Sequence, residues 1–163
     1  MPDFTRNYGT FIAAPVHDVF EYCRDPRHLF AGWPELEVTE VVMSPEGIGT
    51  KAHIVGRFFK GMMVEQIERE YTEFVLDERI VTKAHAKVRF AGRNKEVAKP
   101  PIFTWLFEDR DGGTELTLVV LEEDLSRWQN FMESVSAAVM AKKLNGILAS
   151  VKAGVEIPAP STA

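Results

Sequence analysis

The spacing of apolar residues changes once along this chain, and this change constrains the fold more than any other feature. Between about residues 36 and 121, apolar and polar residues alternate with the period of two that is typical of β-strands. Past Asp124 the period becomes 3.6, and a capping box at residues 126–129 marks the start of a long helix that extends to about Lys152. A run of strands followed by one terminal helix predicts an α+β fold, in which the helix covers one face of an antiparallel sheet.

Two short helices are predicted between the first strand and the rest of the sheet. Residues 5–13 favour a strand, and Pro15 follows at a position suited to the first turn of a helix. The spacing of a helix with one apolar face then appears at Val16, Val19, Phe20 and Cys23. Asp25 and Pro26 end this helix and favour a second helical turn that extends through Phe30.

Turn residues divide the period-two region into strands. The expected strands span residues 37–43, 50–59, 62–73, 79–86, 102–108 and 115–121. Residues 109–113 predict a tight hairpin between the last two strands, because glycine readily adopts positive φ. Residues 92–101 are interpreted as an exposed loop. Together with the first strand, we expect about six or seven antiparallel strands.

Composition places the chain among ordinary globular domains. Of 163 residues, 45% are hydrophobic and 26% are charged, and the formal net charge of −5 argues against a basic nucleic-acid-binding module. We expect one domain over residues 1–156 and a disordered tail over residues 157–163. No uncharged stretch approaches the ~20 residues that cross a bilayer, and no signal peptide is recognised. The single cysteine, Cys23, cannot form an internal disulfide, so we expect a reducing, cytoplasmic setting.

Several short motifs occur in an order that is typical of one superfamily. They are Ile12-Ala-Ala-Pro15, Val19-Phe20, Asp25-Pro26, Trp33-Pro34, Gly47-Ile-Gly49 and Gly112-Gly-Thr-Glu-Leu116, followed by the long helix. From about Tyr8 to Glu156 the chain resembles the helix-grip superfamily of START, Bet v 1 and polyketide cyclase domains, also called SRPBCC. The resemblance implies a curved antiparallel sheet wrapped around the terminal helix. It also implies a cavity between sheet and helix that accepts a hydrophobic small molecule.

Strand parity predicts which side chains face that cavity. In residues 50–59 the even-numbered positions are the more apolar set, so we expect them to point inward. Small inward residues such as Gly56, Ala84 and Ala86 require either a closely packed helix or open space. The alternative is tight closure by aromatic and methionine side chains. The candidate ligand-binding residues are Trp33, Ala52, Ile54, Gly56, Phe58, Met63, Glu65, Ile67, Arg69, Thr82, Ala84, Trp105, Phe107, Phe131 and Val135.

Two charged residues, Glu65 and Arg69, lie on the more apolar face of the strand predicted over residues 62–73. Buried charges must be paired or hydrated, so these two residues form either a structural salt bridge or polar contacts to a ligand. His53 and Arg57 fall on the outer face of the preceding strand. They become acid/base candidates only if the parity is reversed.

Motifs for covalent, metal or cofactor chemistry are missing from the sequence. The four histidines lack the spacing of a zinc site, no phosphate-binding or dinucleotide-binding motif occurs, and Cys23 is interpreted as a buried apolar residue. We therefore expect no catalytic residue, no metal and no cofactor. The expected partner is a hydrophobic small molecule, with no nucleic acid, no stable membrane insertion and a monomeric or homodimeric state.

Two alternatives to a ligand-binding protein stay open from the sequence. The first is a polyketide aromatase/cyclase-like enzyme that moves protons with polar side chains of the cavity. The second is an interaction module resembling Hsp90 activators, in which the basic loop with Arg93, Lys95 and Lys99 contacts an acidic partner.

Overall fold

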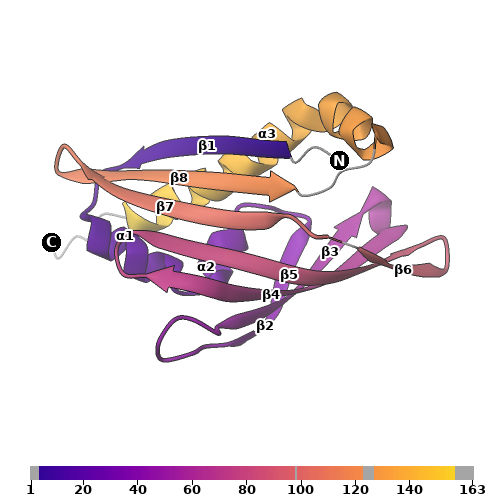
Figure 1. Ribbon diagram of the computed structural model, residues 1–163, viewed down its shortest axis with the longest axis horizontal. Helices are drawn as coiled ribbons and strands as arrows, with labels where there is room; N and C mark the ends of the chain where they lie inside the picture. The colour runs from indigo at the N-terminus through magenta and orange to yellow at the C-terminus, as the bar shows by residue number, and fades with distance from the viewer. Residues whose placement is uncertain (1–3, 98, 123–126, 157–163) are drawn as a thin grey trace, which may run out of the picture.

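The computed structural model describes residues 4–97, 99–122 and 127–156, with the side chains of the last helix described from residue 138 onward. Figure 1 shows a wide sheet with helices against one side. The elements are β1 (Phe4–Ile12), α1 (Val16–Cys23), α2 (Pro26–Phe30), β2 (Leu36–Val42), β3 (Lys51–Phe58), η1 (Phe59–Gly61), β4 (Met63–Val75), β5 (Arg79–Phe90), β6 (Arg93–Val97), β7 (Ile102–Arg110), β8 (Gly113–Glu122) and α3 (Arg127–Val155). This order confirms the α+β helix-grip architecture expected from the sequence.

All the strand pairs of the sheet are antiparallel among the described residues. The strand order is β1-β8-β7-β5-β4-β3-β2, and β6 pairs with the far end of β5. Strand β6 was not predicted, because its residues 93–97 carry no apolar alternation and were interpreted as part of a loop. Ala91 and Gly92 both have positive φ, which is the geometry that a tight two-residue hairpin needs.

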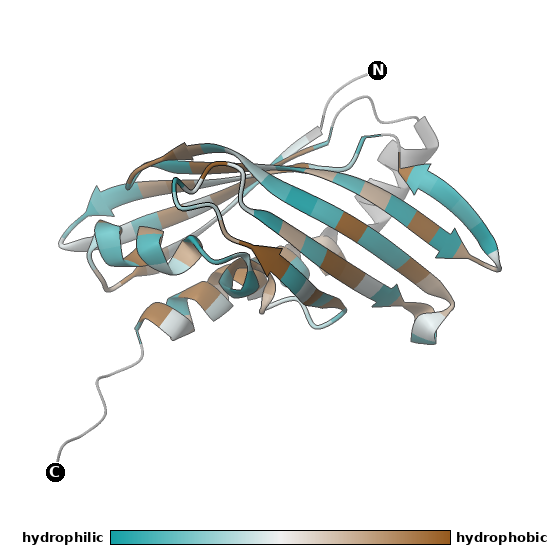
Figure 2. Ribbon diagram, turned by 90° about the horizontal axis from the view of Figure 1, so that it is seen from below, coloured by the Kyte–Doolittle hydropathy of each residue, from teal (hydrophilic) through white to brown (hydrophobic). Residues whose placement is uncertain are grey.

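The alternation that predicted the strands is visible in the structure as bands of apolar and polar residues along the sheet (Figure 2). On β3, Ala52, Ile54 and Gly56 are buried, so the even-numbered positions face inward as predicted. On β4, Ile67 and Arg69 are buried on the same side. We call this side of the sheet, which the helices cover, its inner face.

Helix α3 packs against β1, β8 and both short helices. Four of its apolar side chains are fully buried, namely Leu144, Ile147, Leu148 and Val151. Val139 is also apolar but is 58% exposed, so the buried face of α3 does not extend to it. The predicted N-terminal cap at Ser126 lies outside the described residues, as does the predicted tail. No described helix is both long and apolar enough to span a membrane.

Glycine allows α3 to approach the loop after α2 very closely. A side chain at Gly32 would overlap the carbonyl oxygen of Gly146 and would lie 2.8 Å from Cβ of Ser150. Glycine in a helix costs about 1 kcal/mol relative to alanine. The close backbone contact explains why the helix nevertheless contains Gly146.

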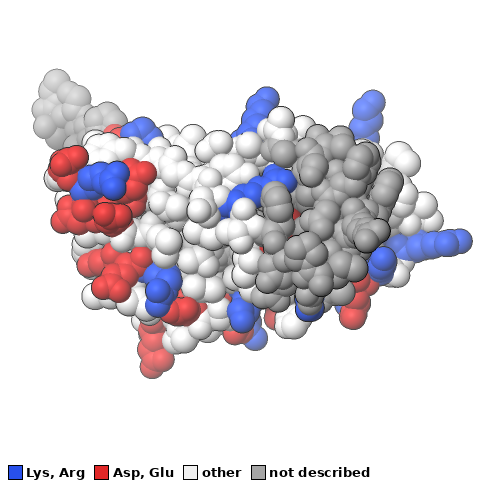
Figure 3. All heavy atoms as spheres, turned by 45° about the horizontal axis from the view of Figure 1, so that its top comes forward, with Lys and Arg blue, Asp and Glu red and all other residues white. Residues whose placement is uncertain are grey.

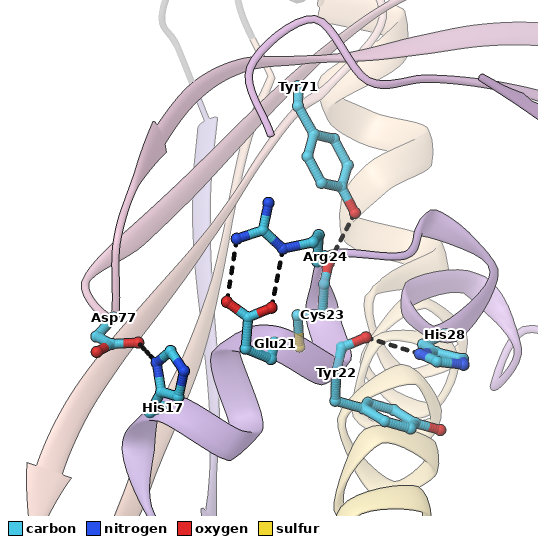
Figure 4. A network of polar contacts seen from close by, with 8 residues as sticks. All are labelled: His17, Glu21, Tyr22, Cys23, Arg24, His28, Tyr71 and Asp77. Carbon is cyan, nitrogen blue, oxygen red and sulfur yellow. Dashed lines mark hydrogen bonds and ion pairs between the residues drawn. The ribbon is translucent and has the colours of Figure 1, made fainter. Parts of the chain in front are cut away.

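A network of polar contacts ties α1 and α2 to the sheet (Figure 4). The Tyr71 hydroxyl of β4 donates a hydrogen bond to the carbonyl oxygen of Cys23, at 2.8 Å. His17 of α1 pairs with Asp77 in the β4–β5 turn, at 2.9 Å. Cys23 is fully buried, and this burial raises the pKa of its thiol, which agrees with its interpretation as an apolar core residue. The two short helices are therefore fixed over the inner face of the sheet.

Candidate functional site

An apolar pocket lies between the second short helix and the inner face of β3, β4 and β5. Its volume is about 90 Å³. Helix α2 and the segment after it contribute one wall, and residues preceding and beginning β7 contribute another. The described lining residues are Phe30, Trp33, Leu36, Ile54, Phe58, Glu65, Ile67, Arg69, Ala86, Pro100, Pro101 and Phe103.

Four aromatic side chains contribute to the pocket wall. Phe30 and Trp33 come from one side, Phe58 from the end of β3 and Phe103 from β7. Phe30 and Phe103 lie 6.3 Å apart between ring centroids, so they continue the aromatic core of the protein into the pocket. Ala86 of β5 adds little side-chain volume on the inner face, which leaves space beside it.

Arg69 is the only fully ionised side chain buried in this wall among the described residues, and it is 5% exposed. Its Nη1 donates hydrogen bonds to Oγ1 of Thr82 at 3.0 Å, to the Thr82 carbonyl oxygen at 3.3 Å and to the Pro101 carbonyl oxygen at 3.1 Å. The guanidinium carbon lies 4.5 Å from the ring centroid of Phe103, within range of a cation–π interaction. Burial lowers the pKa of Arg69 to about 10 against the opposing effect of Glu65, so the side chain stays charged at neutral pH.

Glu65 lies on the same face of β4, four residues before Arg69. Burial raises the pKa of its carboxyl group, and the positive charge of Arg69 only partly opposes this. No ion pair joins the two side chains within the described structure, although their charges still affect each other's pKa. The salt bridge that was one of the two sequence interpretations is therefore not formed directly.

The raised pKa of Glu65 makes a testable contribution to stability. The folded protein binds the Glu65 proton more tightly than the unfolded chain does. The contribution of this group to the free energy of unfolding is therefore largest below the ordinary pKa of 4.5, and it is lost as the pH rises through the higher pKa of the folded state. We expect Glu65→Gln to be more stable relative to the wild type at pH 7 than at pH 4. Urea unfolding of both proteins across this range measures the difference, and a difference that is constant with pH would contradict the burial of an ionisable Glu65.

The structure brings six of the predicted site residues together in the pocket: Trp33, Ile54, Phe58, Glu65, Ile67 and Arg69. Seven others do not line it among the described residues, namely Ala52, Gly56, Met63, Thr82, Ala84, Trp105 and Phe107. The side chains of Phe131 and Val135 lie outside the described part of the chain. Thr82 still matters, because its hydroxyl holds Arg69.

Packing explains why three of these residues lie outside the pocket. A side chain at Gly56 would lie 2.7 Å from the Phe58 ring, so Phe58 fills the space that the small residue leaves. Trp105 is fully buried and packs edge-on against Phe30, with ring centroids 5.9 Å apart. Phe107 packs against Phe20 of α1 in the same core, at 5.1 Å. These residues belong to the closed core beside the pocket.

Sequence reasoning missed half of the pocket wall: Phe30, Leu36, Ala86, Pro100, Pro101 and Phe103. Ala86 carried a signal, because it shares the inward parity of Thr82 and Ala84. The two prolines carried none, because residues 92–101 were interpreted as an exposed loop. The structure instead brings the Pro101 carbonyl group to Arg69.

Larger hollows lie on the outer face of β4, β5 and β6, with volumes of about 550 and 400 Å³. Polar and charged residues such as Gln66, Lys87 and Glu96 line both. His53 lines the second and accepts or donates a hydrogen bond to the Thr39 hydroxyl at 2.9 Å. These open hollows desolvate a ligand less than the inner pocket does.

Charge is distributed unevenly between the two ends of the molecule. Figure 3 shows acidic side chains gathered toward the end where Figure 1 places the β7–β8 hairpin, which carries Glu108, Asp109 and Asp111. The predicted basic loop forms strand β6 in part, where Arg93 and Lys95 are exposed to solvent. These basic side chains lie apart from the inner pocket.

Comparisons with known proteins agree with this geometry. A family model described as "Activator of Hsp90 ATPase homolog 1-like protein" matches residues 13–155. An uncharacterized protein from Rhizobium leguminosarum has 18% identity and a TM-score of 0.62, with 95% of each chain covered. A protein from Arthrobacter aurescens has 16% identity and a TM-score of 0.67, over 95% of this chain and 87% of that chain. Ara h 8.0201 has 15% identity and a TM-score of 0.60, over 94% of this chain and 98% of that chain.

No curated protein matches the sequence. Structural likeness at such low identity shows the fold alone, and this fold is the helix-grip architecture expected from the sequence. The family match extends over nearly the whole described chain. The chain therefore belongs to the family of activator of Hsp90 ATPase homolog 1-like proteins.

Proposed function

We propose that this protein binds a small hydrophobic or aromatic molecule in the pocket between α2 and the inner face of the sheet. The observation that carries the proposal is the composition of the pocket, which combines an aromatic wall with a buried arginine. Ligand sites are typically apolar cavities with a few well-placed polar groups that fix orientation. The basic side chains of β6 are exposed, and the hollow that Lys95 lines is open and polar, so they do not replace the pocket as the first candidate site.

The size of the pocket narrows the class of ligand. A cavity of ~150 Å³ in another protein holds benzene, whereas the volume here is about 90 Å³. We infer a ligand of which only a small apolar part, the edge of a ring or a short chain, enters this volume. Long acyl chains and polyketides of several fused rings need more space than this pocket offers.

The polar groups of the pocket suit a carrier better than a catalyst. Proton-transfer catalysis needs an acid or base poised near neutral pH. Arg69 stays charged, and His53, one titratable side chain considered for this role, lies on the outer face. Glu65 lines the pocket with a raised pKa, but it makes no hydrogen bond to a described residue that could exchange a proton with it. We therefore propose binding without turnover, in the reducing cytoplasm that the single buried cysteine suits.

Filling the pocket tests the proposal. Indole is a small neutral aromatic probe that can present one ring edge to the pocket, and calorimetric titration gives its affinity. Ala86→Leu places three additional carbon atoms into the pocket, so we expect it to weaken indole binding by at least about tenfold. Ala84→Leu adds the same atoms on the same face of β5, outside the described pocket wall, and is expected to bind indole as the wild type does. Equal affinity of Ala86→Leu and the wild type would overturn the proposal.

A further inference from the structure

Arg69 carries a buried positive charge that no described carboxylate neutralises. Its three hydrogen bonds all leave from Nη1 and go to neutral oxygen atoms of Thr82 and Pro101. Glu65, the neighbouring acid in the pocket wall, makes no ion pair with it within the described residues. A buried charge is costly unless an opposite charge or strong hydrogen bonds compensate it. The pocket therefore holds a cation that forms no ion pair with a described carboxylate, and only its three hydrogen bonds and the more distant charge of Glu65 compensate it.

The remaining donors of Arg69 form a fork. Because Nη1 is occupied, Nε and Nη2 are left, and their N–H groups lie parallel on one edge of the planar guanidinium group. Neither nitrogen donates to a described residue. Two parallel N–H groups match the two oxygen atoms of a carboxylate, and such bidentate pairs are among the stronger hydrogen-bonded contacts in proteins.

The fork is also held in place before any ligand arrives. The bonds at Nη1 fix one end of the guanidinium group, and its carbon atom lies 4.5 Å from the centroid of the Phe103 ring. A preorganised group loses little conformational freedom when it binds, so more of the interaction energy appears as affinity. Thr82 acts here as a positioning residue, because its hydroxyl accepts from Arg69 and donates to the Phe103 carbonyl oxygen at 3.3 Å.

We propose that the ligand is a small apolar carboxylic acid, bound as its anion, with the carboxylate on the Nε–Nη2 edge of Arg69 and the apolar body against Phe30, Trp33 and Phe58. This inference rests on the proposed function of the pocket and adds the chemical class of the ligand. The aromatic wall selects against inorganic phosphate or sulfate, because a strongly hydrated ion gains nothing from apolar contacts. Burial raises the pKa of the Glu65 carboxyl group, so its charged form is disfavoured at this position in the pocket wall.

Matched acids and amides test the inference. Cinnamate is a carboxylate with an aromatic apolar part, and hexanoate is one with an aliphatic apolar part. Cinnamamide and hexanamide are their neutral counterparts of nearly equal shape. Calorimetric titration at pH 7 gives the four affinities. For whichever carboxylate binds the wild type more tightly, we expect an affinity at least about tenfold higher than that of its own amide. Arg69→Met should remove this preference, whereas Arg69→Lys, which keeps the charge but not the fork, should retain a smaller preference.

Each result separates the two claims. Amides that bind as tightly as their acids would overturn the anion anchor while the pocket remains a binding site. Failure of all four probes and of indole would overturn the proposed function itself. A preference for acids that persists in Arg69→Met would assign the anchor to another residue. If Arg69→Met does not fold, the ratio of acid affinity to amide affinity in the wild type and in Arg69→Lys still tests whether Arg69 binds the carboxylate.

Discussion

Replacing Gly32 by alanine is expected to destabilise the protein by roughly 3 kcal/mol or more. Added atoms in a well-packed core usually cost about 1 to 3 kcal/mol. At Gly32 the new Cβ meets backbone, overlapping the Gly146 carbonyl group, and a backbone cannot turn away as a flexible side chain can. The helix α3 must therefore shift as a whole. Urea unfolding followed by circular dichroism measures the loss.

Gly146→Ala is the matched control, because it changes the other side of the same contact. Its Cβ would meet the Gly32 carbonyl oxygen at 2.9 Å and otherwise lie free. Alanine also favours the helix by about 1 kcal/mol. We expect a clearly smaller effect than that of Gly32→Ala. Wild-type stability in Gly32→Ala would show that α3 does not approach α2 as the structure describes.

Trp105→Ala is expected to cost about 3 to 5 kcal/mol, the range for removing a large aromatic side chain from a core. Trp105 is fully buried, and its ring packs edge-on against Phe30 and Phe103. Alanine leaves a cavity that these neighbours can fill only by giving up their own contacts. The free energy of unfolding in urea gives the magnitude.

Trp33→Ala provides the comparison, because Trp33 lines the pocket and is only partly buried. We expect a smaller loss of stability and a larger loss of indole affinity than for a substitution in the closed core. If Trp105→Ala instead keeps wild-type stability and loses indole binding, then Trp105 is part of the ligand site, as the sequence alone suggested.

The sheet and its inner face could be predicted because one side of each central strand is buried. A register slip of one residue would turn every apolar side chain outward, so alternation alone specifies the face on which Ile54, Ile67 and Arg69 lie. The β7–β8 hairpin was equally predictable, because Gly112 takes the positive φ that the turn needs. Strand β6 has neither an alternation of apolar residues nor a buried face. It forms by pairing with β5, and the sequence of β6 alone does not indicate this pairing.

The pocket was predicted only in part, because its walls depend on contacts between distant segments. Phe58 turns back over Gly56, and no periodicity specifies a side-chain rotamer. Pro101 reaches Arg69 across 32 positions of sequence. Arg69 was found because a charge on an apolar strand face is unusual in itself, but its partners could not be read from the strand.

The location of bound indole tests the central claim most directly. In the wild-type protein with labelled methyl groups, intermolecular nuclear Overhauser effects report which side chains touch the ring. The account predicts contacts to the methyl groups of Ile54, Ile67 and Ala86, which line the inner pocket. Contacts to Val64 alone, in the hollow on the outer face of β4 and β5, would contradict it.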